Sequence, residues 1–146
     1  MVPKFEFELQ KVLKVRAIRE NLALYDFLQA KKEKESVERH LNQLNNVQHD
    51  ICDFIKQEQL DLYQMIHARD FLHNNRVRIK EKEEQLQQKE QVVIQKKDNL
   101  IEKRKKRRVL DNLKEKKKKQ HYKEMVSREQ KEIDEVAVTY YAGGLS

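Results

Sequence analysis

The chain has 146 residues, enough for one domain, of which 39% are charged and 38% hydrophobic, with a formal net charge of +7. This low apolar content argues against a sizeable globular core. The charged residues are mostly Lys, Arg and Glu, which keep their side-chain freedom in a helix, so composition alone leaves a long helix and a disordered chain both open.

Helix-breaking residues are confined to the two ends of the chain. The only proline is Pro3 and the only glycines are Gly143 and Gly144. Disordered linkers and globular loops rarely lack both residue types over such a length, so the pattern favours helix. One uninterrupted helix would run for roughly 200 Å at about 1.5 Å per residue. We therefore expect an all-α chain that reverses direction once.

The first arm is predicted as a helix over about residues 4–56. Between residues 37 and 54 its apolar positions recur at intervals of three and four, the repeat of a coiled coil. The two heptad rows are Val37, Leu44 and Ile51, and His40, Val47 and Phe54. These rows are expected to face the second arm.

Residues 13–30 carry more apolar side chains than one packing stripe requires. The surplus is clearest at Ile18, Leu22 and Tyr25. Apolar surface of this kind is usually covered by another protein or by a further helix. A partner protein and a thicker or self-associated bundle both remain open.

The reversal is predicted at residues 57–61. Asp61 is placed to cap a helix whose third residue is Gln64, with Leu60 and Met65 forming a flanking hydrophobic staple. A tip here pairs residue i with about residue 118 − i, which sets apolar against apolar. The alternative tip at residues 73–75 would set leucines against unpaired charges, which is costly in a packed contact.

The second arm is predicted as a helix over about residues 62–138. A heptad row runs along it, while its companion row is mostly charged. The row consists of Leu72, Ile79, Leu86, Val93 and Leu100. About 25 residues of this helix extend beyond the pairing, and residues 139–146 are expected to fray or to be disordered. The predicted fold is thus a long antiparallel two-helix coiled-coil hairpin, a single domain over residues 1–146 whose C-terminal helix overhangs.

A dense basic tract lies between Lys103 and Lys119, with 11 Lys or Arg residues against Asp111 and Glu115. Such a patch favours an anionic surface: nucleic acid, a nuclear-import receptor, an acidic membrane or an acidic protein pore. A basic zipper is disfavoured because no leucine heptad follows. Single-strand binding is disfavoured because no aromatic residue is interleaved. A solvated charged face also remains open.

Signatures of catalysis and cofactor binding are missing. No phosphate-binding glycine loop precedes residue 143, and no two histidines lie three or four residues apart. Cys52 is the only cysteine and is expected to be inert in a reducing compartment. The sequence shows no signal peptide and no apolar run long enough to span a membrane. We therefore expect a non-enzymatic cytosolic protein without a cofactor or a bound metal.

Both ends of the chain carry short motifs. The start reads Phe5-Glu6-Phe7-Glu8-Leu9-Gln10-Lys11-Val12-Leu13, followed by Arg19-Glu20, and the end contains Lys131-Glu132-Ile133-Asp134-Glu135-Val136-Ala137. They resemble the Phe-x-Phe-x-Leu-x-x-Leu-Leu opening and the Lys-Glu-Leu-Asp-Glu-Ile-Ala ending of the bacterial flagellar FliJ family. Phe71, Leu72 and Ile79 are similar to its pattern after the hairpin tip.

This resemblance implies an antiparallel coiled coil similar to the central stalk of rotary ATPases. Members of the family stand in the pore of the hexameric flagellar type III export ATPase and bind a transmembrane export gate protein and export chaperones. The implied location is the bacterial cytoplasm, peripheral to the inner face of the cell membrane through partners, with no nucleic acid bound. Alternatives are a generic coiled-coil scaffold, an injectisome stalk and, less favoured, a basic nucleic-acid-binding coiled coil.

The resemblance also suggests two sets of contact residues. Contact with the ATPase ring is expected at the surplus apolar residues and the start of the basic tract: Ile18, Leu22, Tyr25, Lys103, Arg104, Lys105, Lys106, Arg107 and Arg108. Contact with the export gate is expected at Leu44, Val47, Ile51, Phe71, Asn75 and Arg78. Several positions of the second set also belong to the predicted helix–helix packing, so a structural role is equally open for them.

Overall fold

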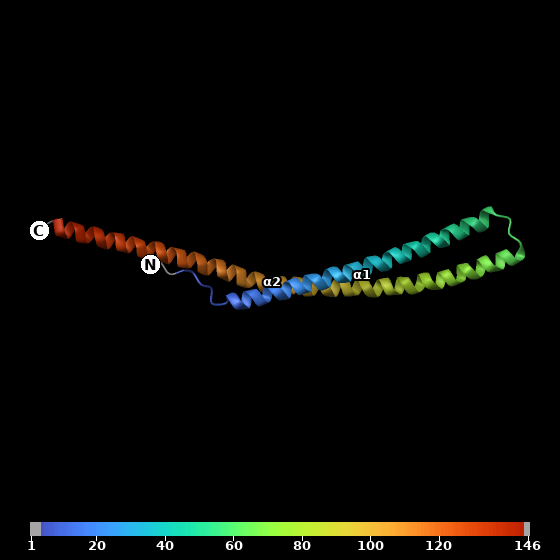
Figure 1. Ribbon diagram of the computed structural model, residues 1–146, viewed down its shortest axis with the longest axis horizontal. Coiled ribbons are helices and arrows are strands. Elements are labelled where there is room, and N and C mark those ends of the chain that lie inside the picture. The colour runs from blue at the N-terminus through green and yellow to red at the C-terminus, as the bar shows by residue number, and fades with distance from the viewer. Residues whose placement is uncertain (1–3, 145–146) are drawn as a thin grey trace. The chain divides into compact units, whose positions relative to one another are not determined.

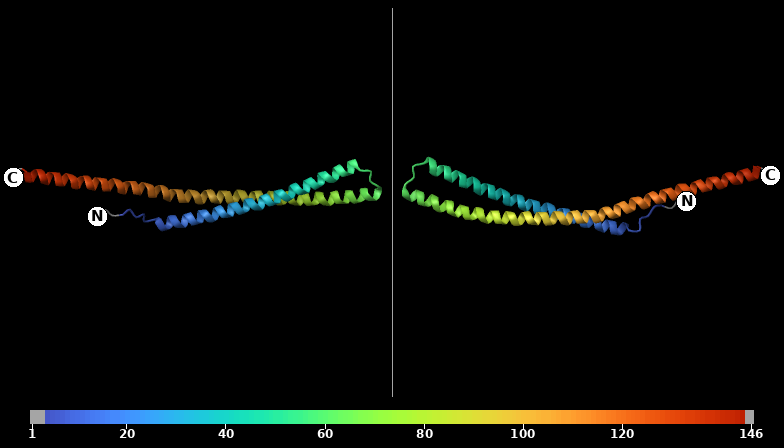
Figure 2. Two further views of the ribbon diagram at one scale, coloured as in Figure 1. Left: turned by 45° about the horizontal axis from the view of Figure 1, so that its top comes forward. Right: turned by 180° about the vertical axis from the view of Figure 1, so that it is seen from behind.

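Two long helices make up most of the chain. The computed structural model describes residues 4–144, and within that range it contains no strand. Helix α1 spans Gln10–Gln57 and helix α2 spans Leu62–Gly144 (Figure 1). The two run antiparallel and side by side in all views (Figure 2). The predicted all-α antiparallel hairpin is confirmed.

The helix–helix contacts fall into two compact regions. One, which we call the open-end region, comprises Met1–Glu20 and Glu102–Ser146, and the other, the tip region, comprises Asn21–Ile101. The boundary lies inside both helices and not at a linker. Each region has its own packing and its own polar contacts.

The turn between the helices is closed by side chains. The backbone N–H of Gln64 donates to Asp61 Oδ1 at 2.7 Å, and the backbone N–H of Asp61 donates to Gln64 Oε1 at 3.2 Å. This reciprocal pair is a capping box, which satisfies amide groups that a helix start leaves unpaired. It places the start of α2 at Leu62 and leaves residues 58–61 as the turn.

The seam of the tip region, meaning the positions where α1 and α2 pack together, follows one predicted row on each helix. Val37 is buried, and Leu44 and Ile51 on α1 are half-buried. On α2 the row from Leu72 to Val93 is half-buried, and Leu100 is buried.

The companion row on α1 differs from the prediction. Its half-buried members are Leu41, Gln48 and Ile55, whereas His40, Val47 and Phe54 are exposed. Both rows lie next to the Val37 row, one three residues and the other four residues along, and both carry apolar side chains. The direction in which the helices cross decides which row is covered.

Lysines fill much of the companion row on α2. Lys82, Lys89 and Lys96 are half-buried, which is compatible with aliphatic stems along the seam and ammonium groups in water. Lys89 Nζ lies 3.1 Å from Glu33 Oε2 on α1. The residue numbers of this pair add to 122, about one helical turn beyond the predicted register of 118.

Asn75 is the one buried polar residue in the described part of the chain, with only 4% of its surface exposed. Its Nδ2 group donates to the backbone carbonyl of Leu44 at 3.1 Å and to Gln48 Oε1 at 2.8 Å. Both partners lie on α1, so the amide links the two helices at one position. A buried amide with its donors satisfied is tolerated where an unpaired one is costly.

The chain enters the open-end region without forming a helix. Residues 4–7 have no regular structure, and α1 starts at Gln10, whose N–H donates to Phe7 O at 3.0 Å. Phe7 is buried with Leu13 and Leu110, with Phe5 and Leu113 packed against them. The predicted helix start near residue 4 was therefore wrong. Residues two apart point to different sides of a helix, whereas an extended segment lets Phe5 and Phe7 face α2 together.

Helix α2 continues well past the start of α1. The Phe5 ring lies 5.6 Å from the His121 ring, and from Val126 to Gly144 every residue of α2 is exposed. We call residues 126–144 the overhang. The fraying expected after residue 138 is absent as far as Gly144, and Thr139 Oγ1 donates to Glu135 O at 2.8 Å within the helix. Residues 145–146 of the expected tail lie outside the described range.

Candidate protein-interaction site

The start of the basic tract lies on α2 in the open-end region. Lys103, Arg104 and Arg107 are half-buried, whereas Lys105, Lys106 and Arg108 are exposed. Since successive residues of a helix point about 100° apart, a run of six cations necessarily surrounds the helix. Only part of this tract is therefore available to a partner.

Glu20 on α1 holds the half-buried arginines. Glu20 Oε1 lies 3.2 Å from Arg104 Nε, and Glu20 Oε2 accepts a hydrogen bond from Arg107 Nε. Arg107 also donates to Asp111 through Nη1. The Glu20 side chain is only 12% exposed. Arg104 and Arg107, both predicted to contact a partner, are thus engaged within the hairpin.

The charged groups of this cluster shift one another's pKa values. The hydrogen bond from Arg107 holds the pKa of Glu20 below its ordinary value, with help from Arg104, although burial opposes the shift. In turn, the hydrogen bond to Glu20 raises the pKa of Arg107. Both groups therefore stay charged at neutral pH, and the cluster fastens α1 to α2 electrostatically.

The remaining cations of the tract differ in their contacts. Lys106 Nζ lies 3.2 Å from Glu102 Oε1 on the same helix, and the Lys106 carbonyl accepts a hydrogen bond of 2.9 Å from Arg16 Nη1. Lys105 and Arg108 are exposed and make no ion pair within the described part of the chain. These two side chains are the best placed of the six to meet an anionic partner.

The three surplus apolar residues of α1 are exposed. Ile18 in the open-end region is 58% exposed, and Leu22 and Tyr25 in the tip region are 60% and 65% exposed. Their spacing of four and three places them along one side of α1. Adjacent Ala23 is buried in the seam, so the exposed residues are not needed for hairpin packing.

The second predicted set, in the tip region, is divided by the seam. Leu44 and Ile51 are half-buried and Asn75 is buried, so these three take part in helix–helix packing. Val47, Phe71 and Arg78 are exposed. Val47 and Arg78 lie together beside a shallow groove of about 380 Å³ between the helices.

Three features were not singled out from the sequence. The Glu20 cluster and the inter-helix contacts of Asn75 depend on the register of the hairpin, which the apolar pattern predicts only to within about one helical turn. The exposed apolar row of the overhang was detectable, because Val126, Ile133 and Tyr140 recur every seven residues. Heptad spacing of this kind predicts a helix-packing surface.

Other kinds of site find no support in the described residues. No group of three or more His, Cys, Asp or Glu residues between residues 4 and 144 is arranged to hold a metal ion. No helix in the same range combines the length and the hydropathy that a membrane span requires. Grooves along the described helix faces, such as the one beside Val47 and Arg78, are open surfaces of the kind that a partner helix or peptide can bind.

Comparison with known families agrees with this description. The sequence profile of the family described as "Flagellar FliJ protein" matches residues 5–146, almost the whole chain. Searches of curated proteins and of solved structures found no match. The family match includes both helices, the turn and the overhang, so the resemblance seen in the two terminal motifs extends through the chain. The chain belongs to the FliJ family of non-enzymatic flagellar export proteins.

Proposed function

We propose that this protein is the stalk of the flagellar type III export apparatus: it inserts into the hexameric export ATPase and couples the ATPase to the transmembrane export gate and to export chaperones. The protein works in the bacterial cytoplasm at the inner face of the membrane, held there by these partners. Family membership supports the flagellar assignment over a generic scaffold or an injectisome stalk.

The observation that carries the proposal is the combination of exposed apolar and unpaired basic residues. In the open-end region Ile18 is exposed on α1, and Lys105 and Arg108 are exposed on α2 without an ion pair. In the tip region Leu22 and Tyr25 are exposed on α1. Burying exposed apolar side chains in a complementary pocket is favourable by about 25 cal/mol per Å². Exposed cations steer a helix toward an acidic pore and set its orientation.

Contact with the export gate is assigned to the exposed members of the second set. Val47, Phe71 and Arg78 provide two apolar side chains and one cation on the surface of the tip region. Leu44, Ile51 and Asn75 support them by fixing the helices that carry them. Substitutions at Asn75 would therefore affect gate binding through hairpin structure and not through lost contact.

Stimulation of the cognate export ATPase tests the proposal. Adding the wild-type chain at low ionic strength is expected to raise the rate of ATP hydrolysis and to favour hexamers. The double variant Lys105→Gln with Arg108→Gln should require several-fold more protein for half-maximal stimulation, because two steering charges are lost. Leu22→Asp should reduce the maximal stimulation itself, because it places a charge in the apolar contact.

The matched control is Arg76→Gln with Lys80→Gln, which removes two exposed cations from α2 in the tip region. This control should stimulate as the wild type does. Equal losses in both double variants would show a nonspecific charge effect, and no stimulation by the wild-type chain would reject the ATPase-stalk proposal. Circular dichroism of each variant confirms that the helices are intact.

A further inference from the structure

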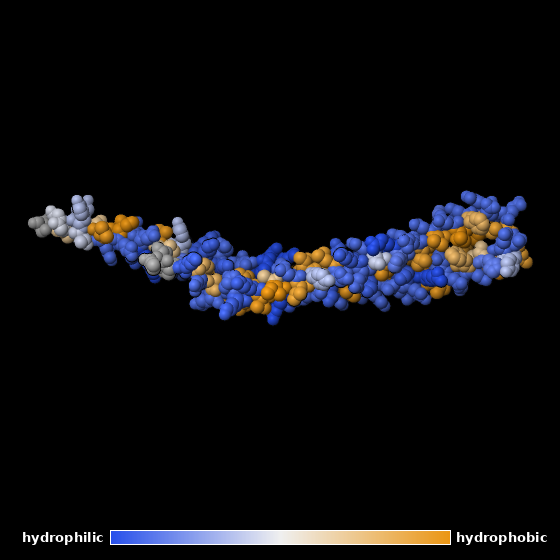
Figure 3. Space-filling model, viewed as in Figure 1, coloured by the Kyte–Doolittle hydropathy of each residue, from blue (hydrophilic) through white to orange (hydrophobic). Residues whose placement is uncertain are grey.

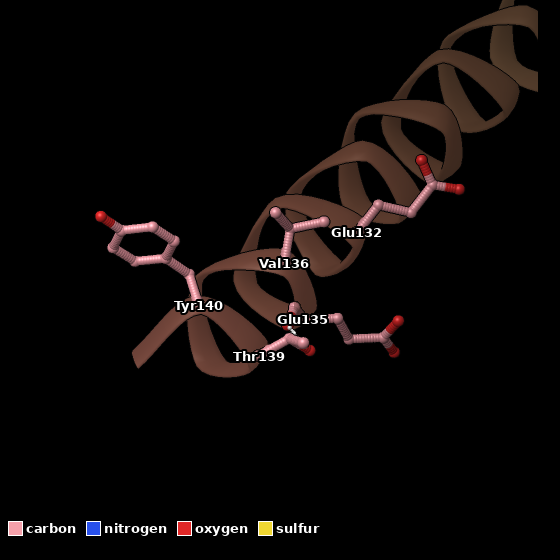
Figure 4. A pocket seen from close by; sticks show the side chains of 5 residues that line it. All are labelled: Glu132, Glu135, Val136, Thr139 and Tyr140. Atoms are coloured by element: carbon pink, nitrogen blue, oxygen red, sulfur yellow. Dashed lines mark hydrogen bonds between the residues drawn. The ribbon is translucent and has the colours of Figure 1, made fainter. Parts of the chain in front are cut away.

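The overhang carries an apolar row that no other described segment covers. Val126, Ile133, Val136 and Tyr140 are all exposed, at spacings of seven, three and four residues. Figure 4 shows Val136 and Tyr140 on successive turns of α2, beside the carboxylates of Glu132 and Glu135. The same segment appears as a hydrophobic patch in Figure 3. We call these four residues the overhang stripe.

A second apolar row lies on the outer side of α1, in the same open-end region. Val12, Val15 and Ile18 are exposed, while adjacent Leu13 is buried against α2. Their spacing of three residues keeps them along one face of the helix. We call these three residues the α1 outer stripe. The overhang stripe, and Val15 with Ile18 on α1, have the spacing of coiled-coil packing positions, with Val12 on the flank, and none of these residues is buried within the hairpin.

The two stripes carry opposite charges on their flanks. The overhang stripe is accompanied by the exposed carboxylates of Glu129, Glu132 and Glu135. The α1 outer stripe is accompanied by the exposed cations Lys11, Lys14 and Arg19. Complementary charges beside two apolar rows are the usual basis of partner choice between helices.

The stripes of one chain cannot reach each other. Arg16 on α1 lies level with Lys106 on α2, because the Arg16 guanidinium binds the Lys106 carbonyl. Ile133 is 27 residues further along the same helix, which at about 1.5 Å per residue is roughly 40 Å away. From Arg16, α1 continues toward Glu20, which contacts Arg104, and so runs away from the overhang.

We propose that two copies of this chain form a two-fold symmetric dimer in which the overhang stripe of each copy packs on the α1 outer stripe of the other. The two identical contacts close the assembly, so neither copy has an overhang stripe or an α1 outer stripe left exposed that could extend the dimer into a filament. In each half, α1 is enclosed between its own α2 and the overhang of the second copy.

The two-fold axis fixes the direction of pairing. Since α1 and α2 are antiparallel within one chain, rotation by 180° places α1 of the second copy parallel to the overhang of the first. In a parallel coiled coil, equivalent heptad positions face each other. Ile133 then packs against Val15 of the second copy, and Val136 packs against Ile18 of the second copy.

This register also matches the charges. It sets Glu132 beside Arg19 of the second copy, and Glu129, the charged residue that interrupts the overhang row, opposite Lys11 of the second copy. A shift of the overhang by one heptad toward the C-terminal end of the second copy's α1 would set Glu132 beside Asp26 of the second copy, which is a like-charge contact. It would also set Glu129 against Ile18 of the second copy. The first register therefore sets both Glu129 and Glu132 beside cations, and the shifted one sets neither beside a cation.

The proposed dimer goes beyond the stalk function and opposes it. Ile18 is covered in the dimer and is also assigned to contact with the ATPase. A chain in the dimer is therefore a reserve form, and it must dissociate before it enters the ATPase ring.

Sedimentation equilibrium of the purified full chain alone, from low to high micromolar concentration, tests the dimer. The wild type is expected to dimerise, and Val136→Asp should raise the dimer dissociation constant at least tenfold. Val138→Asp is the matched control, since Val138 is equally exposed on the overhang but lies outside the stripe. It should dimerise as the wild type does.

Charge reversal tests the register. Glu132→Arg alone and Arg19→Glu alone should each weaken the dimer, and the chain carrying both should recover most of the loss. A wild type that stays monomeric overturns the proposal, as does a dimer that resists Val136→Asp or a double variant without recovery. None of these results uses the ATPase, so failure of the dimer leaves the stalk function standing, and failure of ATPase stimulation leaves the dimer standing.

Discussion

Glu20 shows how a single side chain fastens the open-end region. Its carboxylate receives Arg104 and Arg107, and Arg107 also binds Asp111. The sequence displays the cations as one uniform run, so it does not tell which of them face inward. That distinction needs the register to within one residue, and one turn of error moves every cross-helix charge pair. In the structure Arg104 and Arg107 hold the hairpin, Lys103 is half-buried, and the other three cations of the run are exposed.

Replacing Glu20 with Gln should lower the stability of the hairpin by about 1 to 2 kcal/mol at neutral pH, because the negative charge that strengthens three hydrogen bonds from Arg104 and Arg107 is lost. The pKa of Glu20 is lowered in the folded state, so its favourable contribution is present above the ordinary Glu pKa of about 4.3 and disappears as the pH falls through the lower folded value. Thermal unfolding of wild type and variant should therefore converge at acidic pH.

The control for this experiment is Glu35→Gln, since Glu35 is exposed and makes no ion pair in the described part of the chain. Its melting temperature should stay close to that of the wild type at every pH. A Glu20→Gln variant whose stability difference is unchanged from neutral to acidic pH would show that the cluster acts by packing and not by charge.

At the scale of the helices, the sequence predicted what depends on neighbouring residues. The start of α2 depends on Asp61 and Gln64, three residues apart, and both hydrogen bonds of the capping box form. The predicted companion row of α1 was wrong because the row that contains Leu41 and the row that contains Val47 both carry apolar side chains, so the sequence does not show which one is buried. The predicted start of α1 was wrong because Phe5 and Phe7 both pack against α2 from an extended segment, which they could not do together as part of the helix.

Asp61→Ala should destabilise the protein by about 1 kcal/mol, the usual cost of losing a helix cap. Asp61→Ser should retain most of the stability, because its hydroxyl can still accept the Gln64 N–H. The midpoint of urea unfolding measures both. Glu58→Ala, in the same turn but outside the capping box, should leave the midpoint nearly unchanged. Equal effects of Asp61→Ala and Glu58→Ala would argue against the cap.

At the scale of the whole hairpin, the heptad rows alone do not determine the register in which α1 pairs with α2. Apolar residues that repeat every seven positions pack almost as well after a shift of seven. Asn75 is different, because its amide finds both the Leu44 carbonyl and Gln48 only in the observed pairing of the tip region. A slipped pairing would leave a buried amide without partners, which costs about 1 to 3 kcal/mol.

Asn75→Leu is therefore expected to keep or raise the melting temperature while relaxing the register. In a Cys52→Ser background, a short bismaleimide should cross-link Glu33→Cys with Lys89→Cys within one chain in the presence of Asn75. The pair Glu33→Cys with Lys96→Cys, one heptad further along, should be cross-linked only after Asn75→Leu. Identical cross-linking with Asn or Leu at position 75 would assign the register to the capped turn alone.

The distance along the chain between contacting residues increases steadily from the capped turn. Leu44 and Asn75 are 31 residues apart, whereas Arg16 and Lys106 are 90 apart. Once the first pair has met, each further pair closes only a small additional loop, so contacts add most easily in sequence, as in a zipper. The last contacts to form and the first to break are those of Glu20 and Phe7. Transient opening should therefore begin beside the surfaces assigned to partner binding, and amide hydrogen exchange should be faster there than beside Asn75.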